Sequence, residues 1–303
     1  MNILMPCKTR ADTLRTAKEI LEKRGHRCTI LPWESALKLQ EKIKEGSFDT
    51  LLCAESAVLP RRTVPIRTVY LASAFFCPDK FPASGVSLCL IPHEELAFAY
   101  ITHGAKDKSI RVCGVPLRDT LLRRFTRAES CRALGISEQK TIFLVIGDAV
   151  SASVLKSLVS AVRTFCADTQ ILLLGTGEAR RKGWMSAFAA DSNVFVSEME
   201  SCFSLALSAA DAVFVPAFAP LVCAAARQGK VLTLLHSAVP RTGKNAEFLD
   251  ACGAAFRGKT TADNVSYACR LLESARLHGN MRAAQEKMIL PDAEARLVQF
   301  LEE

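Results

Sequence analysis

The segment 237–245 carries the residues best suited to binding an anion. Arg241, Lys244 and Asn245 stand there beside Thr242, between an apolar strand pattern and a helix pattern. Cationic and hydrogen-bonding groups at a helix N-terminus suit a phosphate through both charge and dipole. A solvated loop in which Asn245 caps the helix explains the same residues equally well.

Two glycine-containing turns follow strand patterns in the second half of the chain. Gly147 and Asp148 follow one strand pattern, and Gly175 and Thr176 follow the next. Backbone N–H groups in such turns can meet a phosphate, although a plain β–α turn has the same composition. Neither turn is a G-x-G-x-x-G, and no G-x-x-x-x-G-K-[ST] occurs, so a dinucleotide fingerprint and a P-loop ATPase are unsupported.

Residues suited to acid–base chemistry are few. His236 ends a strand pattern and is the one candidate for a catalytic base, although a packing role explains it as well. His93 precedes two glutamates at a helix start, which is typical of a helix cap. No G-x-S-x-G elbow is present. The catalytic group is therefore unassigned.

The elements that must position these residues alternate between strand and helix along the whole chain. Strands are expected at 2–6, 28–31, 50–53, 69–72, 87–91, 110–113, 141–146, 170–174, 194–196, 212–215 and 231–235. Helices are expected at 12–24, 36–44, 93–103, 151–164, 201–210, 246–251, 262–274 and 291–301. This alternation predicts an α/β protein with parallel, doubly wound sheets. Ligands in such folds bind beyond the carboxyl ends of the strands, where Glu198 and Met199 also lie.

The length of 303 residues suggests two domains. We expect an N-terminal Rossmann-like domain over 1–117, a second over 118–290, and a C-terminal helix over 291–303 that packs back on the first. Segment 118–132 is charged, has few strand signals, and is expected to be the linker. The apolar run 203–226 imitates a membrane span, but Asp211, Pro216 and Pro220 interrupt it, so a helix, a buried strand and a loop are expected.

Net charge and cysteine content limit which partners and which cellular compartment are expected. A net charge of +8 favours anionic partners such as nucleotide phosphates or acidic lipids, and we expect no nucleic-acid partner. The twelve cysteines form no C-x-x-C pair, which argues against a zinc site, and most lie in apolar runs as small buried hydrophobes. With no signal peptide at the start, these points indicate a reducing cytoplasm.

Several segments resemble one family of transferases. The sequences IPHEEL at 91–96, HG at 103–104 and IRVCGVPLR at 110–118 resemble the interdomain segment of the monogalactosyldiacylglycerol synthase and processive diacylglycerol glucosyltransferase family. The lipid II glucosaminyltransferase is a more distant relative. Segments 132–136, 140–147, 208–211, 245–249 and 253–254 continue the match, which covers most of 90–300.

The resemblance implies the glycosyltransferase type-B (GT-B) architecture, with two Rossmann-like domains whose parallel sheets face a cleft. It also implies hexosyl transfer from a UDP-sugar, held by the C-terminal domain, to a lipid such as diacylglycerol on the cytoplasmic membrane surface, with no cofactor and no metal. The nucleotide-sugar residues would be Gly147, Asp148, Gly175, Thr176, Glu198, Met199, Arg241, Lys244 and Asn245. Candidates on the acceptor or membrane side are Lys8, Arg10, Arg61 and Arg62, for which solvated surface is the alternative.

The chain departs from the family pattern at several sites. Its first loop, 7–11, lacks the family's glycine and histidine. Of the glycine-rich phosphate loop only Gly147 remains, followed by Asp148, whose charge opposes a diphosphate. Ala224 stands where the family has the ribose-binding glutamate, and Arg241 and Thr242 replace a Gln-Glu pair. These losses leave two hypotheses open: an active glycosyltransferase, or a catalytically inactive GT-B-fold binding or scaffold protein.

Overall fold

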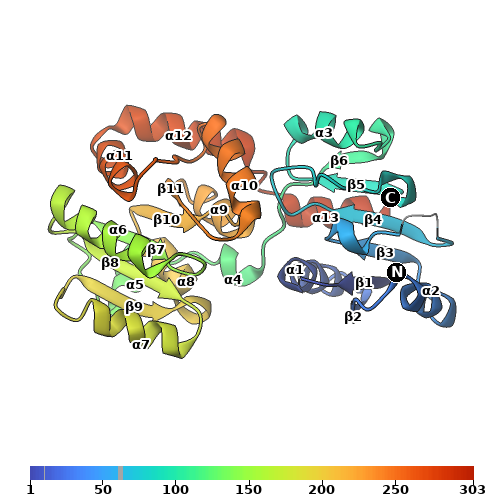
Figure 1. The fold of residues 1–303 in the computed structure, drawn as a ribbon, viewed down its shortest axis with the longest axis horizontal. Coiled ribbons are helices and arrows are strands. Elements are labelled where there is room, and N and C mark those ends of the chain that lie inside the picture. Colours follow the sequence, from blue (N-terminus) through green and yellow to red (C-terminus); the bar gives the residue numbers. More distant parts are fainter. Residues whose placement is uncertain (10, 61–63) are drawn as a thin grey trace. The chain divides into compact units, whose positions relative to one another are not determined.

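The computed structural model describes residues 1–9, 11–60 and 64–303 of the chain. The chain divides into two compact units, each with its own parallel sheet (Figure 1). Unit 1 comprises Met1–Arg118 together with Ile289–Glu303, and unit 2 comprises Asp119–Met288.

Unit 1 is built on a six-stranded parallel sheet with the order β2-β1-β3-β4-β5-β6. Its strands are β1 (Asn2–Cys7), β2 (Arg27–Pro32), β3 (Thr50–Cys53), β4 (Arg67–Leu71), β5 (Leu88–Ile91) and β6 (Ile110–Val112). Its helices are α1 (Ala11–Glu22), α2 (Ala36–Glu45), α3 (Ala97–Thr102) and α13 (Ala293–Glu302), with short 3-10 turns at Ser56–Val58, Ala83–Gly85, Glu94–Leu96 and Asp107–Ser109. All residues of β3 and β5 are buried, as expected of a parallel sheet covered on both faces.

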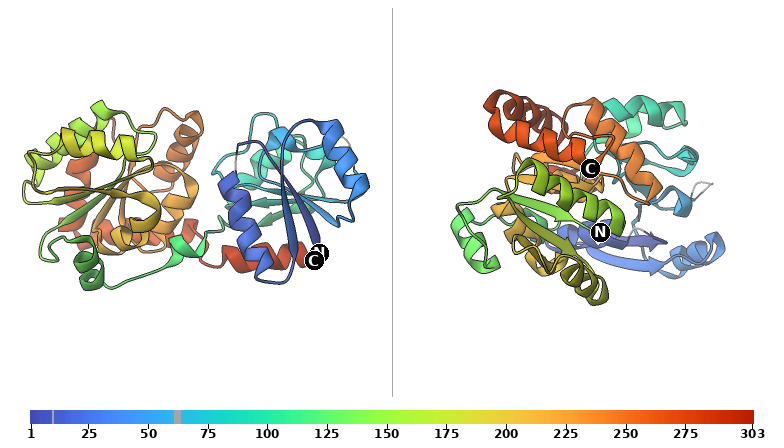
Figure 2. Two further views of the ribbon diagram at one scale, coloured as in Figure 1. Left: turned by 90° about the horizontal axis from the view of Figure 1, so that it is seen from below. Right: turned by 60° about the vertical axis from the view of Figure 1, so that its left-hand side comes forward.

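The last helix, α13, belongs to the core of unit 1. Leu297 and Leu301 are fully buried in the same apolar cluster as Leu14 of α1. The guanidinium of Arg67 donates to the backbone oxygens of the last turn of α13, at 2.9 Å to Phe300 and 2.6 Å to Leu301. A cation placed on the unpaired carbonyls of a helix C-terminus is favourable. The C-terminal end of the chain is thereby fixed to the N-terminal unit (Figure 2).

Unit 2 is built on a five-stranded parallel sheet with the order β11-β10-β7-β8-β9. Its strands are β7 (Ile142–Ile146), β8 (Gln170–Gly175), β9 (Val194–Glu198), β10 (Ala212–Pro216) and β11 (Val231–Leu235). Its helices are α4 (Asp119–Leu122), α5 (Arg127–Leu134), α6 (Ala152–Phe165), α7 (Glu178–Ala187), α8 (Met199–Ala209), α9 (Ala219–Ala226), α10 (Pro240–Ala251), α11 (Thr261–Glu273) and α12 (Ala275–Met288). The two parallel sheets confirm the predicted fold class of two Rossmann-like domains.

Three local predictions are wrong. Segment 118–132 is not a plain linker but contains α4 and most of α5, which a capping box of Thr126 and Glu129 starts. The loop expected after β10 is helix α9, because Pro220 lies in its first turn, where proline is tolerated. The helix expected over 93–103 starts as a 3-10 turn and becomes α-helical only at Ala97.

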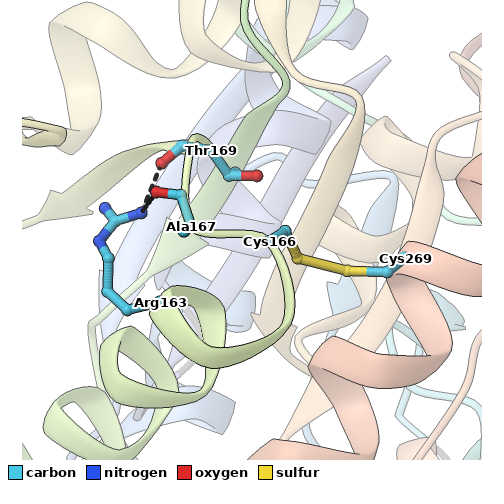
Figure 3. The surroundings of a disulfide bond; sticks show 5 residues. All are labelled: Arg163, Cys166, Ala167, Thr169 and Cys269. Atoms are coloured by element: carbon cyan, nitrogen blue, oxygen red, sulfur yellow. Dashed lines mark hydrogen bonds between the residues drawn. A yellow bond between two sulfur atoms is a disulfide. The ribbon is translucent and has the colours of Figure 1, made fainter.

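The cysteines differ from expectation at one pair. Cys166 at the end of α6 and Cys269 of α11 form a disulfide, and Arg163 beside them donates to the carbonyls of Ala167 and Thr169 (Figure 3). These two cysteines are therefore not the unpaired, buried apolar side chains that the sequence predicts. They are 103 residues apart, so the spacing of cysteines in the sequence does not indicate the pair. Elsewhere burial raises thiol pKa values, to about 11 for Cys28, so such cysteines stay protonated.

The described residues contain no group of three or more His, Cys, Asp or Glu side chains that could hold a metal ion. Among the helices described, none is both long enough and apolar enough to cross a membrane.

Candidate functional site

The predicted nucleotide-sugar residues lie along one edge of unit 2. Because all five strands are parallel, the loops that follow them emerge at the same edge of the sheet. In sheet order from β11 to β9, these loops begin at His236, Ala217, Gly147, Thr176 and Met199. The fold therefore brings together residues that are up to about a hundred positions apart in the sequence.

The turn after β7 is occupied by a carboxylate of the chain itself. Asp148 accepts hydrogen bonds from the backbone N–H of Thr176 (3.0 Å) and from its hydroxyl Oγ1 (3.0 Å). It also forms an ion pair with the guanidinium of Arg180. The backbone donor that precedes α7, which a phosphate would use, is thus bonded to Asp148. The predicted phosphate turn is closed by an internal anion.

The glycines at this edge have a packing role. Trp184 of α7 is 7% exposed and lies against both Gly147 and Gly175. A Cβ atom on either glycine would collide with ring carbons of the indole, closer than real Cβ contacts allow. The indole of Trp184 can therefore pack here only because Gly147 and Gly175 have no Cβ atom. Their presence is explained without a bound phosphate.

The β9–α8 junction carries the predicted pair Glu198 and Met199. Glu198 ends β9, is exposed, and accepts a hydrogen bond from the hydroxyl of Ser201 (3.1 Å). Its carboxylate also pairs with Arg181 at 3.6 Å. Met199 starts α8 and is half-buried. An acceptor and an apolar side chain therefore lie side by side at the end of an edge strand.

The cations of segment 237–245 lie near the start of helix α10. The helix begins at Pro240, so Arg241 lies in its first turn and Lys244 follows one turn later, both exposed. The guanidinium of Arg241 lies 5.6 Å from the ring centroid of Phe218, within cation–π range. Asn245 is 3% exposed, and its Nδ2 donates to the backbone oxygen of Ala217 at 2.8 Å. The alternative in which Asn245 caps this helix is wrong, because Val239 is the N-cap.

The structure does not strengthen the assignment of a catalytic base. His236 directly follows β11 and is exposed. Two residues on, the backbone N–H of Ala238 donates to the oxygen of Ala149, which ties the β11 loop to the β7 loop at 3.4 Å. Ala224, at the position of the family's ribose-binding glutamate, is 2% exposed inside α9 and offers no side-chain acceptor.

A matching contact occurs in unit 1, at the predicted acceptor loop. Glu55, which follows β3, is 8% exposed and accepts from the backbone N–H groups of Lys8 (2.9 Å) and Thr9 (2.7 Å). It also accepts from the Thr9 hydroxyl at 2.5 Å. Lys8 itself is exposed. The other acceptor-side candidates, Arg10, Arg61 and Arg62, lie outside the described residues.

Unit 1 also contains a cavity of about 240 Å³ between the end of β2 and α2. Trp33 and Pro32 line it together with charged side chains of α2. Two of these, Lys42 and Glu45, pair with each other at 2.8 Å. The cavity is separate in sequence from the predicted acceptor candidates.

Sequence reasoning missed Glu55, Arg180, Arg181 and Trp184. Three of them left a signal. Arg180 and Arg181 follow a Gly-Thr-Gly turn within a few residues, where cations oppose the dipole of a helix that starts there, and Glu55 lies two residues after the strand pattern at 50–53. The partners of these residues come from neighbouring strands of the sheet, and only the strand order identifies them.

Comparisons with known proteins connect this architecture to nucleotide-sugar enzymes at the level of the fold. S. aureus MnaA, solved with UDP, matches with a TM-score of 0.70 and 12% identity over 99% of this chain and 96% of that chain. UDP-GlcNAc 2-epimerase from Neisseria meningitidis, bound to UDP-GlcNAc, matches at 0.69 and 12% identity over the whole of both chains. MurG from Acinetobacter baumannii matches at 0.67 and 13% identity, over 99% of each chain.

No protein-family model matches the chain, and a search of curated proteins by sequence finds no match. The solved structures therefore establish the class of fold, which is that of GT-B glycosyltransferases and UDP-GlcNAc 2-epimerases. At 12–13% identity they show the fold alone.

Proposed function

We propose that this protein is glycosyltransferase-like and binds a nucleotide sugar at the carboxyl edge of the unit 2 sheet, without catalysing hexosyl transfer. The observation that carries the proposal is the placement of Arg241 and Lys244 in the first two turns of α10. Both side chains are exposed, and both lie where the fold puts a ligand. Structures with the same fold are solved with UDP and with UDP-GlcNAc.

The contacts around α10 suit a diphosphate at that end of the sheet. Two cations and the dipole of a twelve-residue helix favour negative charge there. Asn245 holds the start of α10 against the loop after β10 by its bond to Ala217, and Phe218 supports the guanidinium of Arg241.

The missing groups favour binding without transfer. Hexosyl transfer requires stabilisation of the leaving diphosphate and deprotonation of the acceptor hydroxyl. The turn at Gly147 offers Asp148 instead of free backbone donors. The position of the ribose-binding glutamate is a buried alanine, Ala224. His236 is the one candidate base, and no hydrogen-bond partner orients its ring within the described part of the chain.

A second candidate function is hexosyl transfer from a UDP-sugar to diacylglycerol at a membrane surface. The same cations, Arg241 and Lys244, favour it because they can stabilise a leaving diphosphate. The net charge of +8 is compatible with association with anionic lipids. The acceptor-side candidates Lys8, Arg10, Arg61 and Arg62 belong to this candidate.

Calorimetric titration with UDP and UDP-hexoses tests the binding proposal. We expect wild-type protein to bind UDP, and Arg241→Ala/Lys244→Ala to weaken it by about tenfold or more, since each charged contact contributes about 1.5–3 kcal/mol. The matched control is Lys259→Ala/Arg270→Ala, which removes the same charge from exposed positions of unit 2. No binding at millimolar UDP, or equal weakening by both double variants, would contradict the proposal.

Activity is tested separately, with UDP-hexoses and vesicles that contain diacylglycerol and anionic phospholipid. We expect no glycolipid by mass spectrometry. Formation of a hexosyl-diacylglycerol that is lost in Arg241→Ala/Lys244→Ala would establish the second candidate instead.

A further inference from the structure

Helix α7 carries two adjacent arginines in its first turn. Arg180 and Arg181 are the third and fourth residues of the helix. The positive end of the helix dipole lies at this end, so cations are disfavoured there and anions are favoured. Two adjacent arginines in a first turn therefore need negative partners to offset the unfavourable field.

Those partners come from the two neighbouring strand ends. Asp148, after β7, pairs with Arg180, and Glu198, at the end of β9, pairs with Arg181 at 3.6 Å. Arg181 also donates to the backbone oxygen of Gly175 at 3.4 Å. The start of α7 thus holds donors suited to an anion, and the anions that they contact are Asp148 and Glu198 of the same chain.

The donors around Asp148 match those that a phosphate uses. A backbone N–H, a hydroxyl and a guanidinium converge on this one carboxylate, from Thr176 and Arg180. The side chain of Asp148 retains 21% exposure, so it lies at the surface of the turn. A phosphate oxygen placed there would meet the same three donors.

We propose that Asp148 is a specificity-determining residue: its carboxylate occupies a phosphate position formed by Thr176 and Arg180, and it keeps a ligand's diphosphate away from the β7–β8 edge. This inference rests on the proposed nucleotide-sugar binding and refines it, because it directs the phosphates to the α10 end of the sheet. What Asp148 excludes from the β7–β8 edge is a diphosphate group, and inorganic pyrophosphate is the simplest ligand that probes this exclusion. Removal of the carboxylate uncovers the donors.

Titration of pyrophosphate into Asp148→Ser measures this exclusion. We expect at least tenfold tighter binding of pyrophosphate by Asp148→Ser than by wild type. Adding Arg180→Ala to Asp148→Ser should reverse the gain. The matched control is Asp168→Ser, which removes one negative charge from a side chain that is 83% exposed and lies outside the edge.

Several outcomes would overturn the inference. These are unchanged pyrophosphate affinity in Asp148→Ser, an equal gain in Asp168→Ser, or a gain that survives Arg180→Ala. Circular dichroism confirms that each variant is folded. If Asp148→Ser does not fold, Asp148→Ala tests the same point, because it also vacates the position that the carboxylate occupies.

Failure of this inference is distinguishable from failure of the proposed function. UDP binding that depends on Arg241 and Lys244 while Asp148→Ser changes nothing would overturn the role of Asp148 alone. A gain of pyrophosphate binding in Asp148→Ser, with no UDP binding by wild type, would support the role of Asp148 and contradict the proposed function.

Discussion

The two units contain the same kind of contact at the carboxyl edges of their sheets. In unit 1, Thr9 donates through its backbone N–H and hydroxyl to Glu55. In unit 2, Thr176 donates through the same two groups to Asp148. In each case the carboxylate comes from a neighbouring strand end and takes a position suited to an anion.

The two contacts differ in burial and in the charge around them. Glu55 is 8% exposed, follows a buried strand, and also accepts from the N–H of Lys8. The side chain of Asp148 is 21% exposed and faces Arg180, which is itself half exposed. We infer that Glu55 fixes the structure of the first loop, whereas Asp148 covers a cationic surface that can be opened.

The largest expected effect concerns how unit 2 is held together at its edge. Trp184→Ala removes the indole that lies against Gly147 and Gly175. We expect a loss of about 3–5 kcal/mol in the free energy of unfolding, since truncation of a buried tryptophan leaves a cavity. Hydrogen exchange of β7 and β8 measures it. A loss below about 1 kcal/mol would show that the carboxylate contact, and not Trp184, holds this edge.

The next prediction compares the two carboxylates directly. Glu55→Ala should destabilise unit 1 by about 3 kcal/mol, because three donors lose a buried charged partner. Asp148→Ala should cost unit 2 about 1 kcal/mol or less, since its donors can turn to water.

The two tryptophans allow this comparison, since Trp33 lies in unit 1 and Trp184 in unit 2. Urea unfolding followed by fluorescence, with the other tryptophan changed to phenylalanine, reports each unit by itself. Equal losses for Glu55→Ala and Asp148→Ala would remove the distinction between the two contacts.

A glycine pair sharpens the packing argument for unit 2. Gly175→Ala should destabilise by about 1–3 kcal/mol, because its Cβ would overlap the ring of Trp184. Gly183→Ala is the control, since nothing lies within 4 Å of its Cβ position inside α7. It should stabilise by about 0.5–1 kcal/mol. Chemical unfolding measures both, and a neutral Gly175→Ala would show that the indole can move away.

The last prediction concerns the amino end of the unit 2 sheet, where Lys230 lies just before β11. Burial lowers the pKa of Lys230 to about 8, and its ammonium donates to the backbone oxygens of Ser208 and Ala210. Between pH 8 and 10.5 the unfolded chain binds more protons at Lys230 than the folded chain, so stability rises with pH in this window. Below pH 8 the contribution is constant.

Urea midpoints of wild type and Lys230→Met measure this dependence. The difference in unfolding free energy, wild type minus variant, should increase from pH 8 to pH 10. A flat difference would show that the folded pKa of Lys230 is not lowered.

The sequence predicts the fold well because apolar strands and amphipathic helices alternate clearly along it. The same patterns fail where packing decides: four of the ten residues of α7 are charged, and α9 is apolar on all sides, so neither shows a clear apolar stripe. Arg241 and Lys244 of α10 are close together in the sequence, so the sequence alone reveals this cationic cluster. The bonds from Asp148 to Thr176 and from Glu55 to Thr9 depend on strand order, which spacing does not reveal.

A crystal structure of the protein with UDP is the most direct test of the proposed binding mode. We expect both phosphates at Arg241 and Lys244, with Asp148 still bonded to Thr176. Phosphates bonded to Thr176 and Arg180 with Asp148 displaced, or no bound UDP at millimolar concentration, would contradict it.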